Sequence, residues 1–313
     1  MRTIKNLVLF ILATTLLAGC GKVSYRKTAG GMPYQLYKGK GTQKVFTGNV
    51  VKVNLSYKVK DSVYFSSFGK IPVYMPVNQE VQPYDISEVM TTLKMGDSLV
   101  ATQMMDTFIK RSPQSIPPEF KKGDRIITTL KVIAIFTNDS AARADEEKEN
   151  KALLASEVEY LSKYLAGKNI SAEKTPSGAF VQIINPGTGN LIDSGKYVSV
   201  NYTGTTLSGK KFDSNTDTAF HHVGPYPFTV NARQMIQGFD EGVRLMKMGG
   251  SAKVYIPSML AYGARPQPGS GIKPFEHLVF DIAIVDVKDK APEVKPAEMP
   301  PGKRKVDMPQ QQK

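Results

Sequence analysis

The stretch VSVNYT at residues 198–203 decides the fold. Val198, Val200 and Tyr202 alternate with polar residues, and this period of two predicts a strand with one face in a core and the other in solvent. The same alternation occupies residues 49–60, which read NVVKVNLSYKVK. The chain therefore carries two similar half-buried strands, of the kind found in antiparallel sheets.

A second pair of matching stretches follows these strands. Residues 93–98 read LKMGDS and residues 246–251 read MKMGGS. A short helix with one apolar stripe is predicted before each match and a strand after it, and the glycines at 249 and 250 are expected to end the second helix. The stripes consist of Ile86, Met90 and Leu93 in the first copy and Ile236, Phe239, Val243 and Met246 in the second. These repeats predict an α+β fold with two copies of one domain, each an antiparallel sheet wrapped on a short helix.

A helical linker is predicted between the copies. Residues 141–166 are rich in Ala, Glu, Lys and Leu, which predicts a helix about 39 Å long with Asp139 or Ser140 as N-cap and Gly167 at its end. Its second half carries an apolar stripe of Leu154, Val158, Leu161 and Leu165. The stripe is too short for an independent coiled coil, so we expect the helix to pack against a neighbouring domain.

These patterns divide the chain into segments. We expect a first domain at residues 31–137, the helical linker at 138–174 and a second domain at 175–288. Residues 289–313 contain five prolines among Lys, Glu and Gln, which predicts a disordered tail.

Residues 1–19 look like the signal peptide of a bacterial lipoprotein. Arg2 and Lys5 precede an apolar run too short to span a bilayer, and the run closes in Leu-Ala-Gly before Cys20. By this resemblance Cys20 becomes the mature N-terminus and carries a lipid that anchors the protein to a membrane of the cell envelope. The outer membrane, facing the periplasm, is preferred because Gly21 is not the aspartate that retains some lipoproteins at the inner membrane. The alternative is a chance match before an ordinary cysteine.

Composition excludes several kinds of chemistry. Cys20 is the only cysteine, so the mature chain can form neither an internal disulfide nor a thiolate metal site. Without Arg2 and Lys5 the count of Lys and Arg falls from 41 to 39 against 28 acidic residues, a net charge of +11. The positive charges are spread along the chain, which favours a solvated surface over a nucleic-acid site. Anionic membrane or polysaccharide surfaces are the weaker alternative partners.

Residues 178–288 resemble the FKBP-type peptidyl-prolyl cis-trans isomerases over essentially their whole domain. Six short motifs occur in family order: TPSG at 175–178, GTG at 187–189, NYTG at 201–204, FDS at 212–214, FDEG at 239–242 and AYG at 261–263. Each motif alone is weak, whereas six in sequence are specific. The resemblance implies an isomerase whose partners are Xaa-Pro segments of unfolded or partly folded envelope proteins.

The same resemblance assigns the site. Asp213, Tyr262 and Phe212 are the expected catalytic residues, with Asp213 and Tyr262 as polar groups in an apolar pocket. The backbone N–H of Ile236 is expected to bind a substrate carbonyl. The residues expected around the substrate proline are Tyr202, Phe228, Met235, Ile236, Phe239 and Phe280, besides Phe212. Phe239 departs from the family, which usually has tryptophan at this pocket floor.

Prolyl isomerisation suits an apolar pocket without reactive groups. Amide resonance opposes rotation with a barrier of about 18–20 kcal/mol, and the twisted transition state is less polar than the planar amide. No nucleophile, metal or cofactor is needed, and none is expected. His221 and His222 have no third ligand in view, so a loop at the pocket rim is favoured over a metal site. Taken singly, each aromatic residue could be core packing, but a carboxylate at Asp213 is costly to bury without a purpose.

The first copy retains the fold pattern and loses the chemistry. Leu55 replaces the pocket tyrosine, Ser66 replaces the aspartate after Phe65, and no Tyr-Gly follows residues 104–105. We expect this domain to fold without isomerising. Holding clients, forming a homodimer and spacing the second domain from the membrane remain open as its roles.

The predicted function is therefore a peptidyl-prolyl cis-trans isomerase that assists the folding of exported proteins. A non-catalytic periplasmic chaperone or assembly subunit that binds extended segments is the alternative. It could belong to surface motility machinery, as some FKBP-type lipoproteins do.

Overall fold

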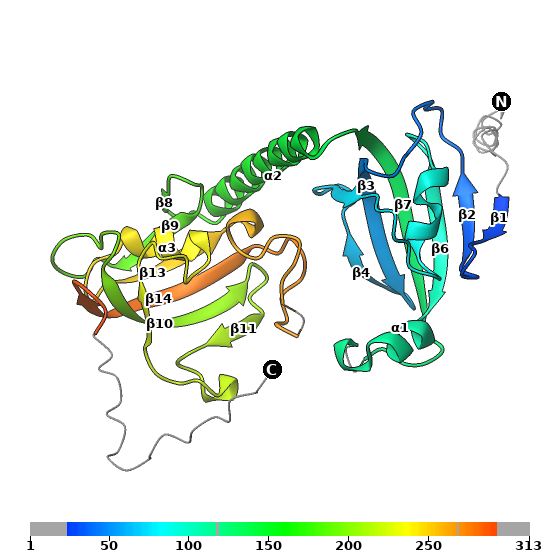
Figure 1. The fold of residues 1–313 in the computed structure, drawn as a ribbon. Coiled ribbons are helices and arrows are strands. Elements are labelled where there is room, and N and C mark those ends of the chain that lie inside the picture. Colours follow the sequence, from blue (N-terminus) through cyan, green and yellow to red (C-terminus); the bar gives the residue numbers. More distant parts are fainter. Residues whose placement is uncertain (1–23, 117–118, 268, 293–313) are drawn as a thin grey trace, which may run out of the picture.

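The computed structural model describes residues 24–292 apart from 117, 118 and 268, and it has two sheet domains at opposite ends of a long helix (Figure 1). The predicted signal peptide, Cys20 and residues 293–313 of the predicted tail lie outside the described residues. The fold class is α+β, as predicted.

The first domain is built on a seven-stranded antiparallel sheet. Its strands are β1 (Ser24–Lys27), β2 (Pro33–Tyr37), β3 (Val50–Val59), β4 (Ser62–Ser66), β5 (Val73–Pro76), β6 (Ser98–Met104) and β7 (Arg125–Phe136). The order across the sheet is β1-β2-β6-β7-β3-β4, and β5 also pairs with β3. Since β1 pairs with β2, the sheet begins before residue 31. The helical elements of this domain are η1 (Ile86–Thr92), α1 (Met105–Arg111) and η2 (Pro113–Ser115).

The second domain has the same sheet topology. Its strands are β8 (Glu173–Lys174), β9 (Phe180–Asn185), β10 (Tyr197–Thr206), β11 (Lys211–Ser214), β12 (Tyr226–Thr229), β13 (Ser251–Ile256) and β14 (Leu278–Lys288). The order is β8-β9-β13-β14-β10-β11, and β12 also pairs with β10. Its helical elements are η3 (Thr218–Phe220), α3 (Gln237–Arg244) and η4 (Ser258–Leu260).

The two sheets match strand for strand, which confirms the predicted duplication. The irregularity in the ladder also falls at the same place, after Lys52 in β3 and after Ser199 in β10. Along β10 buried and partly exposed residues alternate, and Val198, Val200 and Tyr202 face the core. The alternation seen in the sequence therefore marks an inner strand of each sheet, which pairs with neighbours on both sides.

The helix of the second copy is shorter than the sequence pattern suggested, whereas that of the first copy covers its predicted stripe up to the C-cap Leu93. In the first copy it is the 3-10 helix η1, capped by Asp85, whose side chain accepts a hydrogen bond from the N–H of Ser87. In the second copy α3 ends at Arg244, so the expected stop at Gly249 and Gly250 is wrong. Gly249 instead adopts φ +69° in a later turn. Met246 is still buried in the core, although it lies beyond the end of α3.

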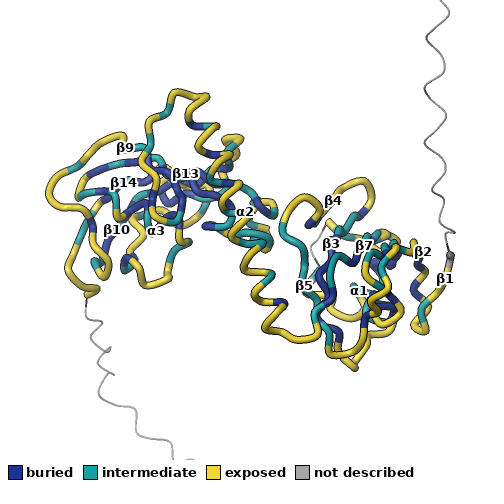
Figure 2. The backbone as a smooth tube through the Cα atoms, turned by 90° about the horizontal axis from the view of Figure 1, so that it is seen from above, coloured by how far each residue is buried: buried dark blue, intermediate teal, exposed yellow. Residues whose placement is uncertain are grey.

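The linker is α2 (Asp139–Gly167), a single helix of 29 residues. Its N-cap is Asn138, whose side chain accepts a hydrogen bond from the N–H of Ala141 at 2.9 Å, so neither predicted cap residue is correct. Leu161 and Leu165 are buried against the outer face of the second sheet, as the apolar stripe predicted. The second sheet thus lies between α2 on one face and α3 on the other, and Figure 2 shows the buried strands between exposed outer surfaces.

Polar contacts fix α2 to both domains. In the first domain the Lys52 ammonium lies 2.6 Å from Asp145 and 2.7 Å from Glu149. In the second domain Glu157 is buried and accepts hydrogen bonds from the Ser258 hydroxyl and from the N–H of Met259. The helix therefore holds the two domains in one arrangement. Within the part of the chain that the structure describes, none of the helices combines the length and apolar character needed to cross a membrane.

Candidate active site

An aromatic cluster lies on the inner face of the second sheet. Tyr202 on β10 and Phe280 on β14 have ring centroids 6.1 Å apart, and Phe212 on β11 meets Phe280 edge-on at 5.6 Å. Phe239 on α3 approaches Phe280 at 5.1 Å from below. Edge-to-face packing of this kind is the favoured geometry for aromatic rings. The structure thus brings together side chains from three strands and a helix.

Phe228 and Phe239 underlie this cluster. Both are buried in the core, with 2% and 0% of their surface exposed, and their rings meet edge-on at 6.0 Å. In this structure they support Tyr202 and Phe280 from behind and present no open surface of their own. Met235 and Ile236 are partly buried at the edge of the same core.

Close approach of the rings requires a glycine in β10. A Cβ added at Gly204 would lie 2.6 Å from an atom of the Phe212 ring and 2.9 Å from an atom of the Phe280 ring. Real side chains do not tolerate such distances, so the small residue in the motif NYTG makes room for the two rings. Packing of these two rings therefore explains why the motif has glycine at position 204.

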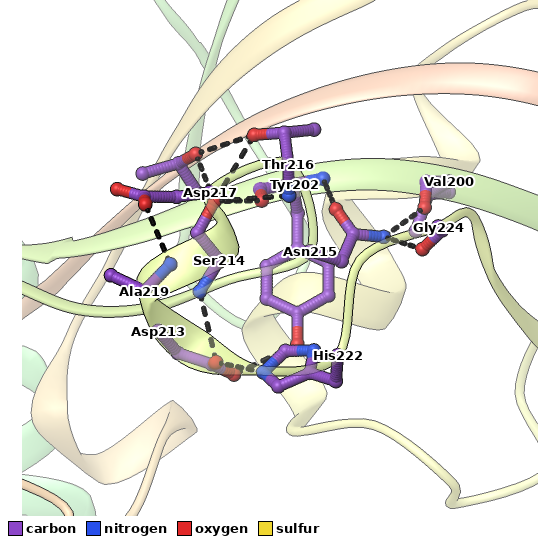
Figure 3. A network of polar contacts seen from close by, with 11 residues as sticks. Val200, Tyr202, Asp213, Ser214, Asn215, Thr216, Asp217, Ala219, His222 and Gly224 are labelled. Carbon is purple, nitrogen blue, oxygen red and sulfur yellow. Dashed lines mark hydrogen bonds and ion pairs between the residues drawn. The ribbon is translucent and has the colours of Figure 1, made fainter.

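Asp213 lies at the rim of the cluster and has three hydrogen-bond donors (Figure 3). The Tyr202 hydroxyl donates to one carboxylate oxygen at 2.8 Å. The N–H of Ser214 and the ring Nε2 of His222 donate to the other, at 2.9 Å and 2.7 Å. Burial, followed by this bond to Asp213 and its charge, raises the pKa of Tyr202 well above its ordinary value. The tyrosine therefore stays protonated and keeps the carboxylate in place.

Asn215 holds the strands and the loop around this carboxylate together (Figure 3). It is buried, and its side-chain oxygen accepts a hydrogen bond from the N–H of Tyr202 at 2.7 Å. Its amide nitrogen donates to the carbonyls of Val200 and Gly224, each at 2.8 Å. One side chain therefore joins β10 to the loop that carries His222.

Two hydrogen-bond donors near the cluster are available to a ligand. Tyr262 is 40% exposed, and burial and then the charge of Asp213 raise its pKa. Its loop is braced by Gly263, which adopts φ +54° and donates its N–H to the carbonyl of Ser258 at 2.9 Å. The N–H of Ile236, directly before α3, has no acceptor among the residues that the structure describes, and the same is true of the Tyr262 hydroxyl.

Sequence reasoning missed two residues of this arrangement, Asn215 and Tyr226, and the contact of a third, His222, with Asp213. Tyr226, on β12, is 42% exposed and meets the Tyr202 ring edge-on at 6.4 Å. The histidine pair was expected at the rim, but the contact of His222 with Asp213 depends on how the 215–224 loop folds back. The only signal in the sequence was a polar loop directly after the FDS motif.

The first copy lacks the chemistry, but one matched position needs correction. Ser66 lies opposite Ser56 in the register that pairs Ser214 with Thr203, so Ser66 corresponds to Ser214. The counterpart of Asp213 is therefore Phe65, and the sequence match was one residue out of step. A shift of one residue in a strand moves every side chain to the other face, which is why the register had to be seen.

Other substitutions in the first copy follow from the same register. Tyr57, which pairs with Phe65, stands in place of Gly204, and Leu55 stands in place of Tyr202 as predicted. Ser67 stands in place of Asn215. Its hydroxyl accepts a hydrogen bond from the N–H of Leu55 at 2.8 Å, just as the Asn215 side chain accepts one from the N–H of Tyr202. The first copy has thus kept the strand connection and replaced the carboxylate with an aromatic ring.

Comparisons with known proteins identify the family of the second domain. The family described as FKBP-type peptidyl-prolyl cis-trans isomerase matches residues 189–285. A peptidyl-prolyl cis-trans isomerase of Schizosaccharomyces pombe is 38% identical over 114 residues, which cover 36% of this chain and 97% of that protein. A probable FKBP-type isomerase of Haemophilus influenzae is 30% identical over 173 residues, covering 55% of this chain and 68% of that protein. The chain belongs to the FKBP-type peptidyl-prolyl cis-trans isomerase family.

The match to longer relatives is partial. FkpA of Escherichia coli, an FKBP-type peptidyl-prolyl cis-trans isomerase, is 34% identical over 149 residues, which are 48% of this chain. The chain spans about half the length of that relative, since the match covers 52% of it.

Proposed function

We propose that the second domain catalyses cis-trans isomerisation of Xaa-Pro bonds in unfolded or partly folded exported proteins. The observation that carries this proposal is the Asp213 carboxylate at the rim of an aromatic cluster, bonded to Tyr202 at 2.8 Å, with the Tyr262 hydroxyl and the Ile236 N–H left for a ligand. Family membership of the chain supports it.

The proposed mechanism is stabilisation of a twisted amide. Rotation about the prolyl bond reduces charge separation, so an apolar surface of aromatic rings favours the transition state over the planar ground state. The Ile236 N–H and the Tyr262 hydroxyl would hold carbonyls of the substrate while the bond rotates. The Asp213 carboxylate would hold Tyr202 and His222 in place through its hydrogen bonds. Its negative charge would face the twisted amide. No covalent step is involved.

We further propose that the protein acts as a lipoprotein in the bacterial envelope, anchored through Cys20 and facing the periplasm from the outer membrane. The support is the order of charged, apolar and small residues before this cysteine. Expression of a Cys20→Ser chain with labelled palmitate tests this. Label on the wild type only, with loss of the variant from the membrane fraction, is expected. Equal labelling of both chains contradicts the lipid anchor.

A direct assay of isomerisation tests the enzyme proposal. We expect Asp213→Ala to lower kcat/KM of the full chain on a tetrapeptide with one Xaa-Pro bond by about tenfold or more, which corresponds to about 1.4 kcal/mol. Asp286→Ala is the matched control, because Asp286 is a partly exposed aspartate of the same sheet paired with Lys288. Equal rates for wild type and Asp213→Ala would count against catalysis at this site.

A second candidate function is binding of extended segments without catalysis. A cavity of 380 Å³ in the first domain favours it, lined by Tyr57, Tyr64, Met105 and Phe108 among others. The two functions separate in one comparison. If binding is the sole role, the chain suppresses aggregation of an unfolded protein without speeding any prolyl isomerisation. Measurable isomerisation by the wild type excludes that reading.

A further inference from the structure

A groove of 370 Å³ lies between the two domains, next to the candidate active site. One wall comes from the first domain and includes Phe65, Ile71 and Pro72, and the opposite wall comes from the second domain and includes Met259, Tyr262 and Phe275. Side chains of α2 complete the lining. The groove is therefore built from three parts of the chain that are far apart in sequence.

The walls of the groove are held at a fixed separation. The contacts of α2 with Lys52 on one side and with Ser258 and Met259 on the other leave the linker no free hinge between them. The hydroxyl of Tyr74, another residue of the first wall, donates to Asp145 of α2 at 2.5 Å. A further contact joins the two domains, since the Lys70 ammonium lies 5.8 Å from the centre of the Phe275 ring. A client entering this space would meet a preformed surface.

Tyr262 belongs both to the groove wall and to the residues assigned to the candidate site. The charge of Asp213 acts on this tyrosine from the side of the aromatic cluster, and the same residue forms part of the groove wall. Phe68, in the loop that carries Ile71, is 42% exposed although it is a large apolar side chain. An apolar surface that leads away from a site for proline suits the residues that flank the proline in a polypeptide.

We propose that this groove binds the apolar residues that flank the target proline in an unfolded polypeptide, so that the first domain supplies part of the substrate-binding surface of the second. The proposal rests on the proposed isomerase function. It gives the first domain a role in substrate selection: the enzyme prefers an extended protein chain with apolar residues near the proline over a short peptide that ends before the groove.

Two substrates and one pair of variants test the proposal in the full chain. Ile71→Glu places a charge in the groove, and Val63→Glu is the matched control, because Val63 is 61% exposed on β4 and does not line the groove. The substrates are the tetrapeptide and a reduced, carboxymethylated ribonuclease whose refolding is limited by prolyl isomerisation. Circular dichroism first checks that both variants keep the wild-type fold.

We expect Ile71→Glu to lower kcat/KM on the protein substrate at least fivefold, mainly through KM, and to change the rate on the tetrapeptide by less than twofold. Val63→Glu should change neither. Equal effects of Ile71→Glu on the two substrates, or no effect on either, would overturn the inference.

Binding measurements separate this inference from the isomerase proposal. If the wild type fails to isomerise even the tetrapeptide, the proposed function fails. The groove is then tested by fluorescence anisotropy with the labelled, carboxymethylated ribonuclease, for which Ile71→Glu should weaken binding at least fivefold. Two other occupants would overturn the inference. If deletion of residues 289–313 raises the affinity for the ribonuclease threefold or more, the tail occupies the groove. If the wild type forms dimers that Ile71→Glu dissociates, a second copy of the chain occupies it.

Discussion

At the scale of single residues, the site depends on how one carboxylate is held. A carboxylate among aromatic rings is costly to desolvate, and three donors offset that cost at Asp213. The sequence could indicate Asp213, because an aspartate after an inward-facing phenylalanine is unusual without a purpose. It could not indicate the donor His222, because that contact is made by a loop whose path depends on Asn215.

Removal of one donor to this carboxylate should lower activity while leaving the aromatic packing in place. We predict that Tyr202→Phe lowers kcat/KM on the tetrapeptide by about three- to tenfold, or about 0.7–1.4 kcal/mol. This is less than the full contribution of about 1.5–3 kcal/mol from a hydrogen bond to a charged group, because the Ser214 N–H and His222 still hold the carboxylate. Tyr226→Phe is the matched control, since the Tyr226 ring touches Tyr202 but its hydroxyl makes no hydrogen bond within the part of the chain that the structure describes. Equal rates for the two variants would show that the Tyr202 hydroxyl does not position Asp213 for catalysis.

At the scale of elements, strand patterns were more informative than helix patterns. Alternation along β3 and β10 predicted an inner strand of each sheet, because one buried face imposes a period of two. The helix in the second copy was predicted too long, because apolar spacing continued past Arg244 after the hydrogen-bonded helix had ended. The apolar stripe of α2 correctly indicated packing on a domain, but the same sequence gave no sign of the polar contact at Glu157.

The buried contact of α2 with η4 should be important for stability. We predict that Glu157→Ala lowers the free energy of unfolding by about 2–3 kcal/mol, because it leaves the Ser258 hydroxyl and the Met259 N–H without their charged acceptor. Glu159→Ala, two residues away and paired only with Lys163 on the surface, should change it by less than about 0.5 kcal/mol. Urea unfolding of the full chain measures both values. Similar midpoints for the two variants would mean that α2 is held mainly by its apolar stripe.

At the scale of the whole molecule, the junction of α2 and the second domain also contains a titrating group. Burial, and then the nearby Lys70, lowers the pKa of His277, while Glu157 and Glu276 act in the opposite direction. The N–H of Ser258 donates to Nδ1 of His277 at 3.2 Å, so this nitrogen must be unprotonated. The ring also stacks on Tyr160 of α2 at 5.3 Å. Protonation of His277 would therefore disturb the contact between linker and domain.

The lowered pKa of His277 determines how the stability of the fold changes with pH. Because the folded pKa of His277 lies below the unfolded value of about 6.5, its contribution to stability is complete above that pH and is lost as the pH falls below it. We predict that unfolding free energy drops between pH 7.5 and 5.5 in the wild type and drops less in His277→Gln. His221→Gln, an exposed position, is the control and should follow the wild type. Parallel profiles for wild type and His277→Gln would contradict this assignment.

The duplication shows what sequence could and could not predict for the whole molecule. Repeated motifs were enough to predict two copies of one fold and the loss of the site in the first. They were not enough to match residues across the copies, since Phe65 and not Ser66 stands in the place of Asp213. The groove between the domains was also beyond the sequence, because it depends on where α2 places one domain against the other.

The most direct test of the central proposal is an exchange measurement by NMR on a peptide with one Xaa-Pro bond, with the full chain added in three forms. We expect wild type and Phe65→Asp to speed exchange between the cis and trans signals equally. Asp213→Phe, which gives the second copy the residue of the first, should abolish the effect. Undiminished exchange with a folded Asp213→Phe chain would mean that catalysis lies outside the Asp213 site.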